Sequence, residues 1–165
     1  MGIPKMAKLY PDRLPEYYNG HECKGSFTWR HLGHRFMTDI LEINLVGIIM
    51  RTEEEKLSFL YAILDGASEA LDIQRNDING TYYHTGEGRP AFILFDEVPG
   101  GAGHVKRIYD NLRPTFKAAL ARVNRCECGL DTSCYNCLRN YQNQYHHDLL
   151  QRGLAISTLK NILDA

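Results

Sequence analysis

The chain has 165 residues, of which 44% are hydrophobic and 24% are charged, a composition typical of a soluble globular domain of ordinary size. It contains no apolar run of about 18 residues, so the sequence predicts no membrane span. The net charge of −1 excludes no partner, but it is unevenly spread. Residues 1–100 carry 10 Lys and Arg against 15 Asp and Glu, whereas residues 101–165 carry 9 against 5. The basic C-terminal part permits contact with nucleic acid.

The chain is expected to divide near residue 33. Three prolines interrupt residues 1–33, which show no clear periodicity, and we expect an N-terminal arm or a domain edge there. Residues 34–165 carry regular patterns and are expected to form one domain.

The first patterned elements are a strand and a helix. Residues 34–50 alternate and are rich in β-branched and apolar side chains, which predicts one long strand. Thr52, followed by the acidic residues 53–55, is a helix start with a capping box, and an apolar stripe continues to residue 72. A helix is therefore expected over 52–72.

Two further strands and two helices follow. Residues 77–84 and 91–97 read as strands of a hairpin, with a turn at 86–89. A helix is expected over 102–124, and Pro114 predicts a break near Leu112. A last short helix is expected over 155–163. The predicted fold class is α/β (α+β), with a mostly antiparallel sheet and packed helices.

A glycine-rich turn links the strand 91–97 to the next helix. A strand, a glycine-rich turn and a helix N-terminus can bind a phosphate, because free N–H groups point at the turn. The alternative is that the glycines only allow the turn and close packing. The residues of this turn are Asp96, Pro99, Gly100, Gly101 and Gly103.

The sequence of this region bears on two kinds of enzyme, an ATPase and a nuclease. The chain lacks the G-x-x-x-x-G-K-[ST] motif, so we expect no ATPase site in it. A nuclease that uses Asp96, Glu97 and His104 with a metal ion is a second possibility. We expect no catalytic activity from the chain by itself.

Four cysteines lie close together and form a C-x-C-x5-C-x2-C array: Cys126, Cys128, Cys134 and Cys137. Two close pairs joined by a short loop suit tetrahedral Zn²⁺, so we expect a C-terminal zinc knuckle with four cysteine ligands. Disulfides, a redox pair and an iron–sulfur cluster are the alternatives. Reduced thiols, and an N-terminus without a visible secretory segment, predict the cytoplasm. Cys23 is expected to be a bystander.

Basic residues between the glycine-rich turn and the cysteines, and one just after the cysteines, are candidates for phosphate contact. The tyrosines after the cysteines can stack on bases or form a local core around the knuckle. The candidates are Lys106, Arg107, Arg113, Lys117, Arg125 and Arg139.

From about Gly33 to Asp164 the sequence resembles a known family, most specifically from Asp96 to Gly153. The turn D-x-x-P-G-G-x-G, the four-cysteine array, and the following C-L-R-x-Y-x-N-Q and D-L-L-x-R-G segments are similar to the MrfA-type zinc-binding (MZB) domain of superfamily 2 DNA helicases. Similar domains occur in bacterial anti-phage systems. The resemblance implies that the four cysteines bind Zn²⁺ and that the domain supports a helicase motor, on the same or a separate chain.

We therefore expect a C-terminal accessory domain that stabilises a DNA helicase, contacts DNA, or does both. The motor lobes are missing from this chain. The alternatives are a protein–protein adaptor in a helicase-containing defence or repair complex, and the metal-dependent nuclease.

Overall fold

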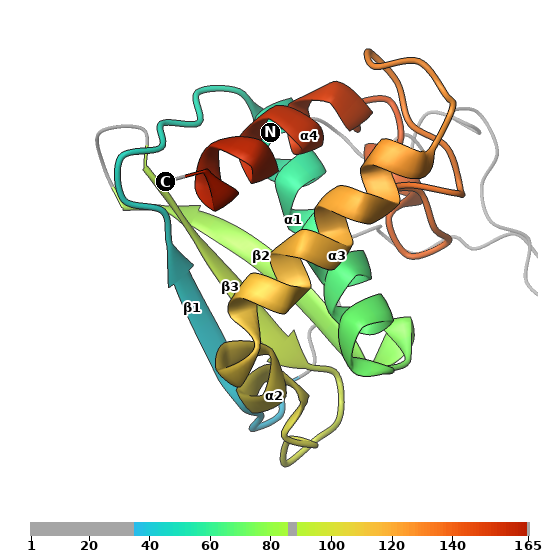
Figure 1. Ribbon diagram of the computed structural model, residues 1–165. Helices are drawn as coiled ribbons and strands as arrows, with labels where there is room; N and C mark the ends of the chain where they lie inside the picture. The colour runs from blue at the N-terminus through green and yellow to red at the C-terminus, as the bar shows by residue number, and fades with distance from the viewer. Residues whose placement is uncertain (1–34, 86–88, 165) are drawn as a thin grey trace, which may run out of the picture. The chain divides into compact units, whose positions relative to one another are not determined.

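The computed structural model describes residues 35–85 and 89–164. The expected arm over 1–33 and the start of the turn over 86–89 lie outside these residues. In chain order the elements are β1 (Ile40–Asn44), α1 (Glu53–Leu71), η2 (Arg75–Asp77), β2 (Ile78–His84), β3 (Pro90–Asp96), α2 (His104–Asp110), α3 (Leu112–Arg125), η3 (Gln144–His146) and α4 (Arg152–Leu163) (Figure 1). The predicted α+β class is confirmed.

The sheet is antiparallel throughout, with strand order β1-β3-β2. The predicted hairpin is confirmed: Gly80 of β2 lies opposite Leu94 of β3. On the other edge, Ile43 of β1 lies opposite Phe92. Because strand side chains alternate between faces, Phe92 and Leu94 both point to the face that α1 covers, where they are fully buried.

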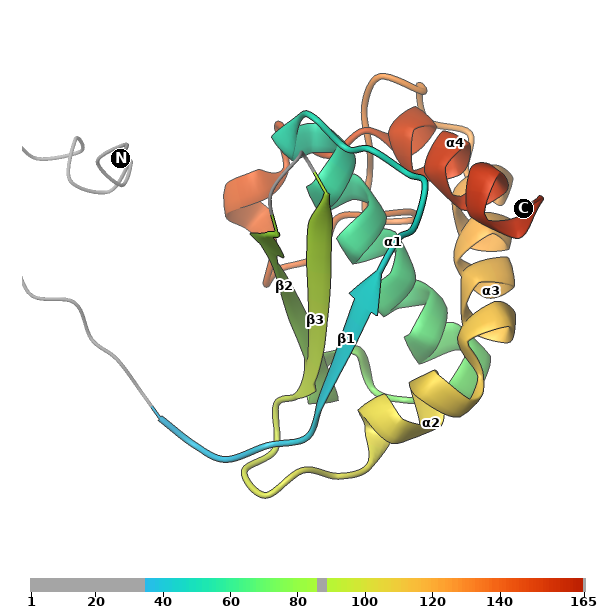
Figure 2. The ribbon, with the colours of Figure 1, turned by 90° about the vertical axis from the view of Figure 1, so that its left-hand side faces the viewer.

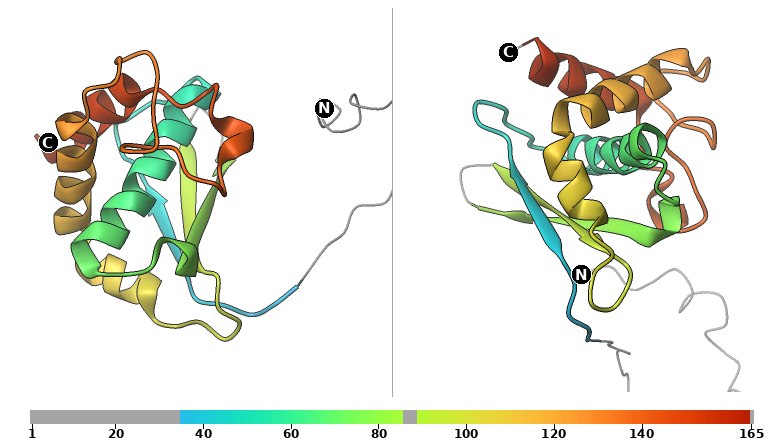
Figure 3. Two further views of the ribbon diagram at one scale, coloured as in Figure 1. Left: turned by 90° about the vertical axis from the view of Figure 1, so that its right-hand side faces the viewer. Right: turned by 60° about the horizontal axis from the view of Figure 1, so that its bottom comes forward.

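Three layers build the domain: the sheet, then α1, then α3 with α4 (Figures 2 and 3). Helix α1 lies between the other two layers, so its residues from Lys56 to Ala67 are all buried. The rings of Phe59 and Phe92 join α1 to the sheet in an edge-to-face contact with centroids 4.9 Å apart. No helix in the described part of the chain is long and apolar enough to cross a bilayer.

The start of α1 follows the predicted capping box. Thr52 Oγ1 accepts a hydrogen bond from the Glu55 amide at 3.2 Å, and Glu55 Oε2 accepts one from the Thr52 amide at 3.0 Å. Two of the amides that lack a partner within the helix are thereby satisfied.

The prediction of one long strand over 34–50 is wrong in length, because β1 covers only Ile40–Asn44. Gly47 has a φ of +81°, a left-handed conformation that ends an extended run. The segment after β1 then crosses the domain toward Thr52, and Leu45, Ile48 and Met50 pack against the core on the way. Alternating apolar residues in this segment therefore reflect burial in a loop.

The expected helix over 102–124 is two helices, and the predicted break is confirmed. Helix α2 ends at Asp110 and α3 begins at Leu112, with Asn111 between them at φ −131°. Pro114 lies in the first turn of α3, where its missing N–H costs no helical hydrogen bond. Helix α4 begins at Arg152, three residues before the predicted start.

Candidate metal centre and its surroundings

The four cysteines lie together directly after α3. Cys126 is the residue that ends α3, and the other three follow on the loop that leads toward α4. Their sulfur atoms all lie within 4.8 Å of one another. In residues 35–85 and 89–164, no other group of three or more His, Cys, Asp or Glu side chains could hold a metal ion.

The spacing of the sulfur atoms fits a tetrahedral ion. Four of the Sγ–Sγ distances lie between 3.4 and 3.9 Å. A regular tetrahedron with Zn–S bonds of about 2.3 Å has edges of about 3.8 Å. A disulfide requires about 2.0 Å, so the four thiols are placed as separate ligands.

The protonation of the thiols depends on their surroundings. Burial raises the pKa of the Cys137 thiol and of the Cys128 thiol. A hydrogen bond from the Cys128 backbone lowers the pKa of Cys126 to about 7. Four thiolates this close would repel one another strongly, so a cation is needed to hold all four in the charged form.

Two arginines fix the backbone around the cysteines. Arg122 of α3 donates from Nε to the Cys137 carbonyl at 3.1 Å. Arg152, the first residue of α4, donates to the Val123 carbonyl at 3.0 Å and to the Cys128 carbonyl at 2.5 Å. The cysteine loop is thus tied to both helices of the outer layer. The sequence alone did not show this role of Arg152.

The loop is also closed by backbone contacts. The Cys134 carbonyl accepts hydrogen bonds from the amides of Cys137, Leu138 and Arg139. The Gly153 amide donates to the Leu130 carbonyl at 2.7 Å, and a Cβ at Gly153 would lie 2.9 Å from that oxygen. The glycine after Arg152 therefore permits the close contact between α4 and the loop.

The glycine-rich turn is organised by Asp96, which is fully buried. Its carboxylate accepts hydrogen bonds from the amides of Ala102 at 2.6 Å, His104 at 3.1 Å and Val105 at 3.0 Å. These are the amides at the start of α2 that a phosphate would need. The side chain of the protein itself fills that role, which favours the purely structural interpretation of the turn.

Backbone conformation and close packing explain why glycines occupy this turn. Gly100, Gly101 and Gly103 all have positive φ angles. A Cβ at Gly101 would lie 2.5 Å from Asp39 Oδ2, so the turn packs directly against the segment that precedes β1. Pro99 is exposed next to Gly100, whose amide donates to the Met37 carbonyl.

The residues of the nuclease hypothesis are held by separate partners. Asp96 caps α2, as described. Glu97 Oε1 accepts a hydrogen bond from Asn79 Nδ2 at 2.6 Å, and His104 Nε2 lies 3.8 Å from Asp77 Oδ2. The three side chains do not form a common metal site.

Four of the six basic candidates have structural contacts. Arg107 donates to the Leu71 carbonyl at the end of α1, and Arg113 donates to the Leu163 carbonyl at the end of α4. Arg125 makes two hydrogen bonds to Glu69, at 2.6 and 2.9 Å. Arg139 donates to the hydroxyls of Ser133 and Thr132. Lys106 and Lys117 are exposed, on α2 and α3 respectively.

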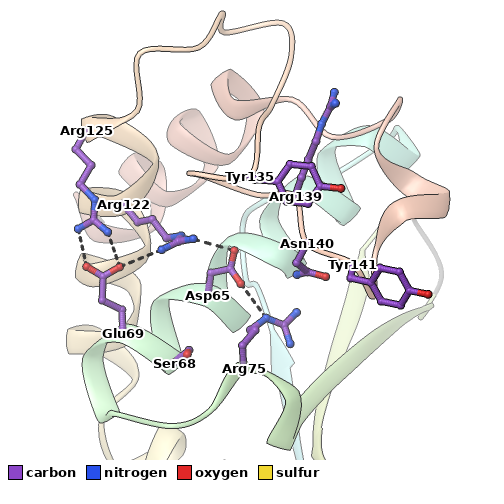
Figure 4. A pocket seen from close by; sticks show the side chains of 10 residues that line it. All are labelled: Asp65, Ser68, Glu69, Arg75, Arg122, Arg125, Tyr135, Arg139, Asn140 and Tyr141. Atoms are coloured by element: carbon purple, nitrogen blue, oxygen red, sulfur yellow. Dashed lines mark hydrogen bonds and ion pairs between the residues drawn. The ribbon is translucent and has the colours of Figure 1, made fainter.

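A charged network lies between α1, η2 and α3 (Figure 4). Asp65 is buried and accepts a hydrogen bond from Arg75 at 2.8 Å, with Arg122 at 3.7 Å. Burial raises the pKa of Asp65, and the two arginines oppose that effect. The hydrogen bond from Arg125 lowers the pKa of Glu69. Sequence charge alone could not separate these paired arginines from free ones.

Comparison with known proteins agrees with this geometry. Residues 59–138, from α1 through the last cysteine, match the family MZB, the MrfA Zn-binding domain. The chain is 30% identical over 163 residues to the Druantia protein DruE of Escherichia coli (strain UMEA 4076-1). This match covers 86% of the chain but only 9% of DruE.

Two solved structures share the fold. The DUF1998 helicase MrfA bound to DNA matches with a TM-score of 0.52 and 18% identity, over 73% of this chain and 15% of that one. MrfA bound to DNA and AMPPNP matches with a TM-score of 0.57 and 16% identity, over 90% of this chain and 18% of that one. The chain therefore spans a small part of each of these relatives. The part that matches the MZB family, residues 59–138, contains the four cysteines, which are gathered between α3 and α4.

Proposed function

We propose that this chain is the zinc-binding accessory domain of a DNA helicase. The observation that carries this proposal is the cluster of four cysteine sulfurs at tetrahedral spacing within an MZB-type domain. The ligands would be Cys126, Cys128, Cys134 and Cys137, and Zn²⁺ would be structural, because four protein ligands leave no coordination position open.

The role of zinc in this proposal is to fix the outer layer. The loop between Arg125 and Arg152 contains only one short helix, η3, so its backbone hydrogen bonds are turn contacts and not the regular ladder of a helix or sheet. A metal ion on four thiolates would close this loop and position Arg122, Arg139 and Arg152 relative to α1. Metal binding would then contribute directly to folding.

DNA contact is proposed for the basic surface of α2, α3 and the cysteine loop. The matched MrfA structures are of a helicase bound to DNA, which supports a DNA context for this domain. Lys106 and Lys117 are exposed and can reach phosphates, whereas Arg107 and Arg113 cap helix ends. Arg139 is considered separately below.

A specific surface favours the adaptor hypothesis as a second candidate. The loop after β1 and the end of α4 line an apolar hollow of about 640 Å³ that includes Leu45, Val46, Ile49 and Ile162. Val46 is 92% exposed. Exposed apolar groups gathered in this way are typical of protein contact, here with helicase motor lobes.

The biological setting is part of the same proposal. The match to a Druantia protein supports a defence context, and the matches to MrfA support a helicase context, with DNA repair as the other possibility. Cysteines that bind a metal ion and do not form disulfides are typical of a reducing compartment, which favours the cytoplasm.

The test is DNA binding at two salt concentrations, before and after chelation. We expect zinc-loaded protein to bind DNA more weakly at the higher salt concentration, because phosphate contacts release counterions. Chelation should abolish binding. The variants Lys106→Glu and Lys117→Glu should each bind more weakly and with a smaller salt slope, whereas Lys160→Glu on α4 serves as the charge-matched control. Zinc-loaded protein without DNA affinity would contradict DNA contact and support the adaptor.

A further inference from the structure

A groove runs along the inner side of the cysteine loop (Figure 4). Its volume is about 570 Å³, and a neighbouring hollow of about 490 Å³ shares Arg122, Arg125 and Tyr135 with it. Together they form a continuous depression between α1, α3 and the segment 134–141. The main groove has no cysteine in its lining, whereas Cys126 lines the neighbouring hollow.

The groove carries a surplus of positive charge. Four arginines line its main part, against two carboxylates. Asp65 and Glu69 already pair with Arg75, Arg122 and Arg125. Arg139 is different, because its guanidinium donates to neutral hydroxyls and has no carboxylate partner in the described part of the chain. Its charge is thus available to an anion.

Two exposed tyrosines line the same groove as Arg139. Tyr135 is 65% exposed and Tyr141 is 81% exposed, although both line the groove. The Tyr135 ring is supported from one side by His147, in an edge-to-face contact with centroids 5.5 Å apart. Its remaining surface is available to another flat group. The tyrosines after the cysteines, Tyr141 and Tyr145, are 81% and 74% exposed and do not form the local core that was one of the two expectations.

The floor of the groove holds two unused donors. Arg75 Nη2 and Asn140 Nδ2 are buried and have no hydrogen-bond acceptor in residues 35–85 and 89–164. Both residues line the groove. Buried donors without an acceptor are uncommon, but these two atoms are closed to solvent, so a ligand oxygen would reach them only after the surrounding side chains move.

We infer that this groove binds single-stranded nucleic acid, with bases stacked on Tyr135 and Tyr141 and a phosphate at Arg139. The inference rests on the proposed DNA-binding function and names its contact surface. Exposed aromatic rings beside a cationic groove are the features by which proteins bind unpaired bases without regard to sequence. Bases in a duplex are stacked on each other and offer no face to these rings. An acidic peptide would use the arginine but would leave both rings unused.

The experiment uses the zinc-loaded full chain and a short fluorescein-labelled oligothymidylate, followed by fluorescence anisotropy. Replacing Tyr141 with Ala should weaken binding about fivefold or more, since one stacked base contributes about 1–3 kcal/mol. Tyr141→Phe keeps the ring and should bind as the wild type does. Tyr83→Ala, on β2 and 45% exposed, is the matched control outside the groove and outside the basic surface of α2 and α3. Zinc content measured for each variant shows that the knuckle is intact.

The outcomes separate this inference from the proposed function. Wild-type affinity in both Tyr141→Ala and the double variant Tyr135→Ala/Tyr141→Ala would show that the groove is not the binding surface. The proposed DNA-binding function would then still stand. Equal affinity for a duplex of the same sequence, or tighter binding of a labelled oligoglutamate, would also overturn the inference. If the zinc-loaded wild type binds no nucleic acid at all, the inference and the DNA-contact part of the proposed function both fail.

Discussion

Arg152 donates a hydrogen bond from Nη2 to the backbone carbonyl of Cys128, at 2.5 Å. This bond joins the first residue of α4 to the cysteine loop, and Nη1 of the same side chain reaches Val123 in α3. One guanidinium therefore connects the two outer helices through the site at which we place the metal.

Replacing Arg152 with Met should destabilise the domain and accelerate zinc loss. The variant leaves the Val123 and Cys128 carbonyls without their charged hydrogen-bond donor. This loss should lower the free energy of unfolding by about 2–4 kcal/mol. Urea denaturation and zinc transfer to a chromogenic chelator measure the two effects. Arg113→Met removes a similar bond at the exposed end of α4 and should cost less than about 0.5 kcal/mol. Equal effects of the two substitutions would contradict the role of Arg152.

Replacing Asp96 with Ala should destabilise the start of α2 without changing DNA affinity. Three amides lose their acceptor in a buried position, at a cost of about 2–3 kcal/mol. Thermal unfolding measures the loss, and anisotropy with labelled DNA at a temperature where the variant is folded measures the affinity. Metal-dependent DNA cleavage by the wild type that disappears in this variant would instead support the nuclease hypothesis.

Replacing Gly66 with Ala should destabilise the protein, although alanine is the better helix former. A Cβ at this position would lie 2.6 Å from Ala119 Cβ and 2.7 Å from the Thr115 carbonyl oxygen, so α1 and α3 would have to separate. Overpacking of this kind costs about 1–3 kcal/mol, against about 1 kcal/mol gained in propensity. Ala70→Gly, at an exposed position of α1, is the control and should be destabilising through propensity alone. Higher stability of Gly66→Ala would contradict the packing described here.

Zinc retention should fall as the pH is lowered. Zinc binds the thiolate forms of the cysteines, and burial raises the pKa of Cys128 and Cys137 when no cation is present. The metal-free protein therefore binds more protons than the zinc form, so lower pH favours release. Competition with a chelator between about pH 8 and pH 5.5 measures the shift, corrected for protonation of the chelator. Retention that is independent of pH would argue against thiolate ligands.

Local sequence signals predicted most of the elements. The capping box at Thr52, the hairpin of β2 and β3, and the break before Pro114 each depend on neighbouring residues, and each lies where expected. The strand at 34–50 was overestimated because alternation cannot distinguish a strand from a loop that buries every second side chain. The structure distinguishes the two, because β1 pairs with β3 only over Ile40–Asn44 and Gly47 has a positive φ.

The basic candidates show why charge alone does not identify an interface. Lys106, Arg113 and Lys117 would share one face only on a continuous helix, but the break at Asn111 separates Lys106 from the others. Arg107 and Arg125 find partners on α1, far away in the sequence. Such partners depend on the tertiary arrangement. The cysteine cluster could be predicted because its members are close in sequence.

The most direct test of the central claim is the zinc content of the purified chain and of its Cys134→Ser variant, measured by elemental analysis together with unfolding by circular dichroism. We expect about one zinc ion per wild-type chain. The variant should hold almost none and should lose the ordered structure of residues 126–164. A wild-type chain without zinc, or a Cys134→Ser variant that stays folded and fully loaded, would contradict the claim that these four cysteines form a structural zinc site.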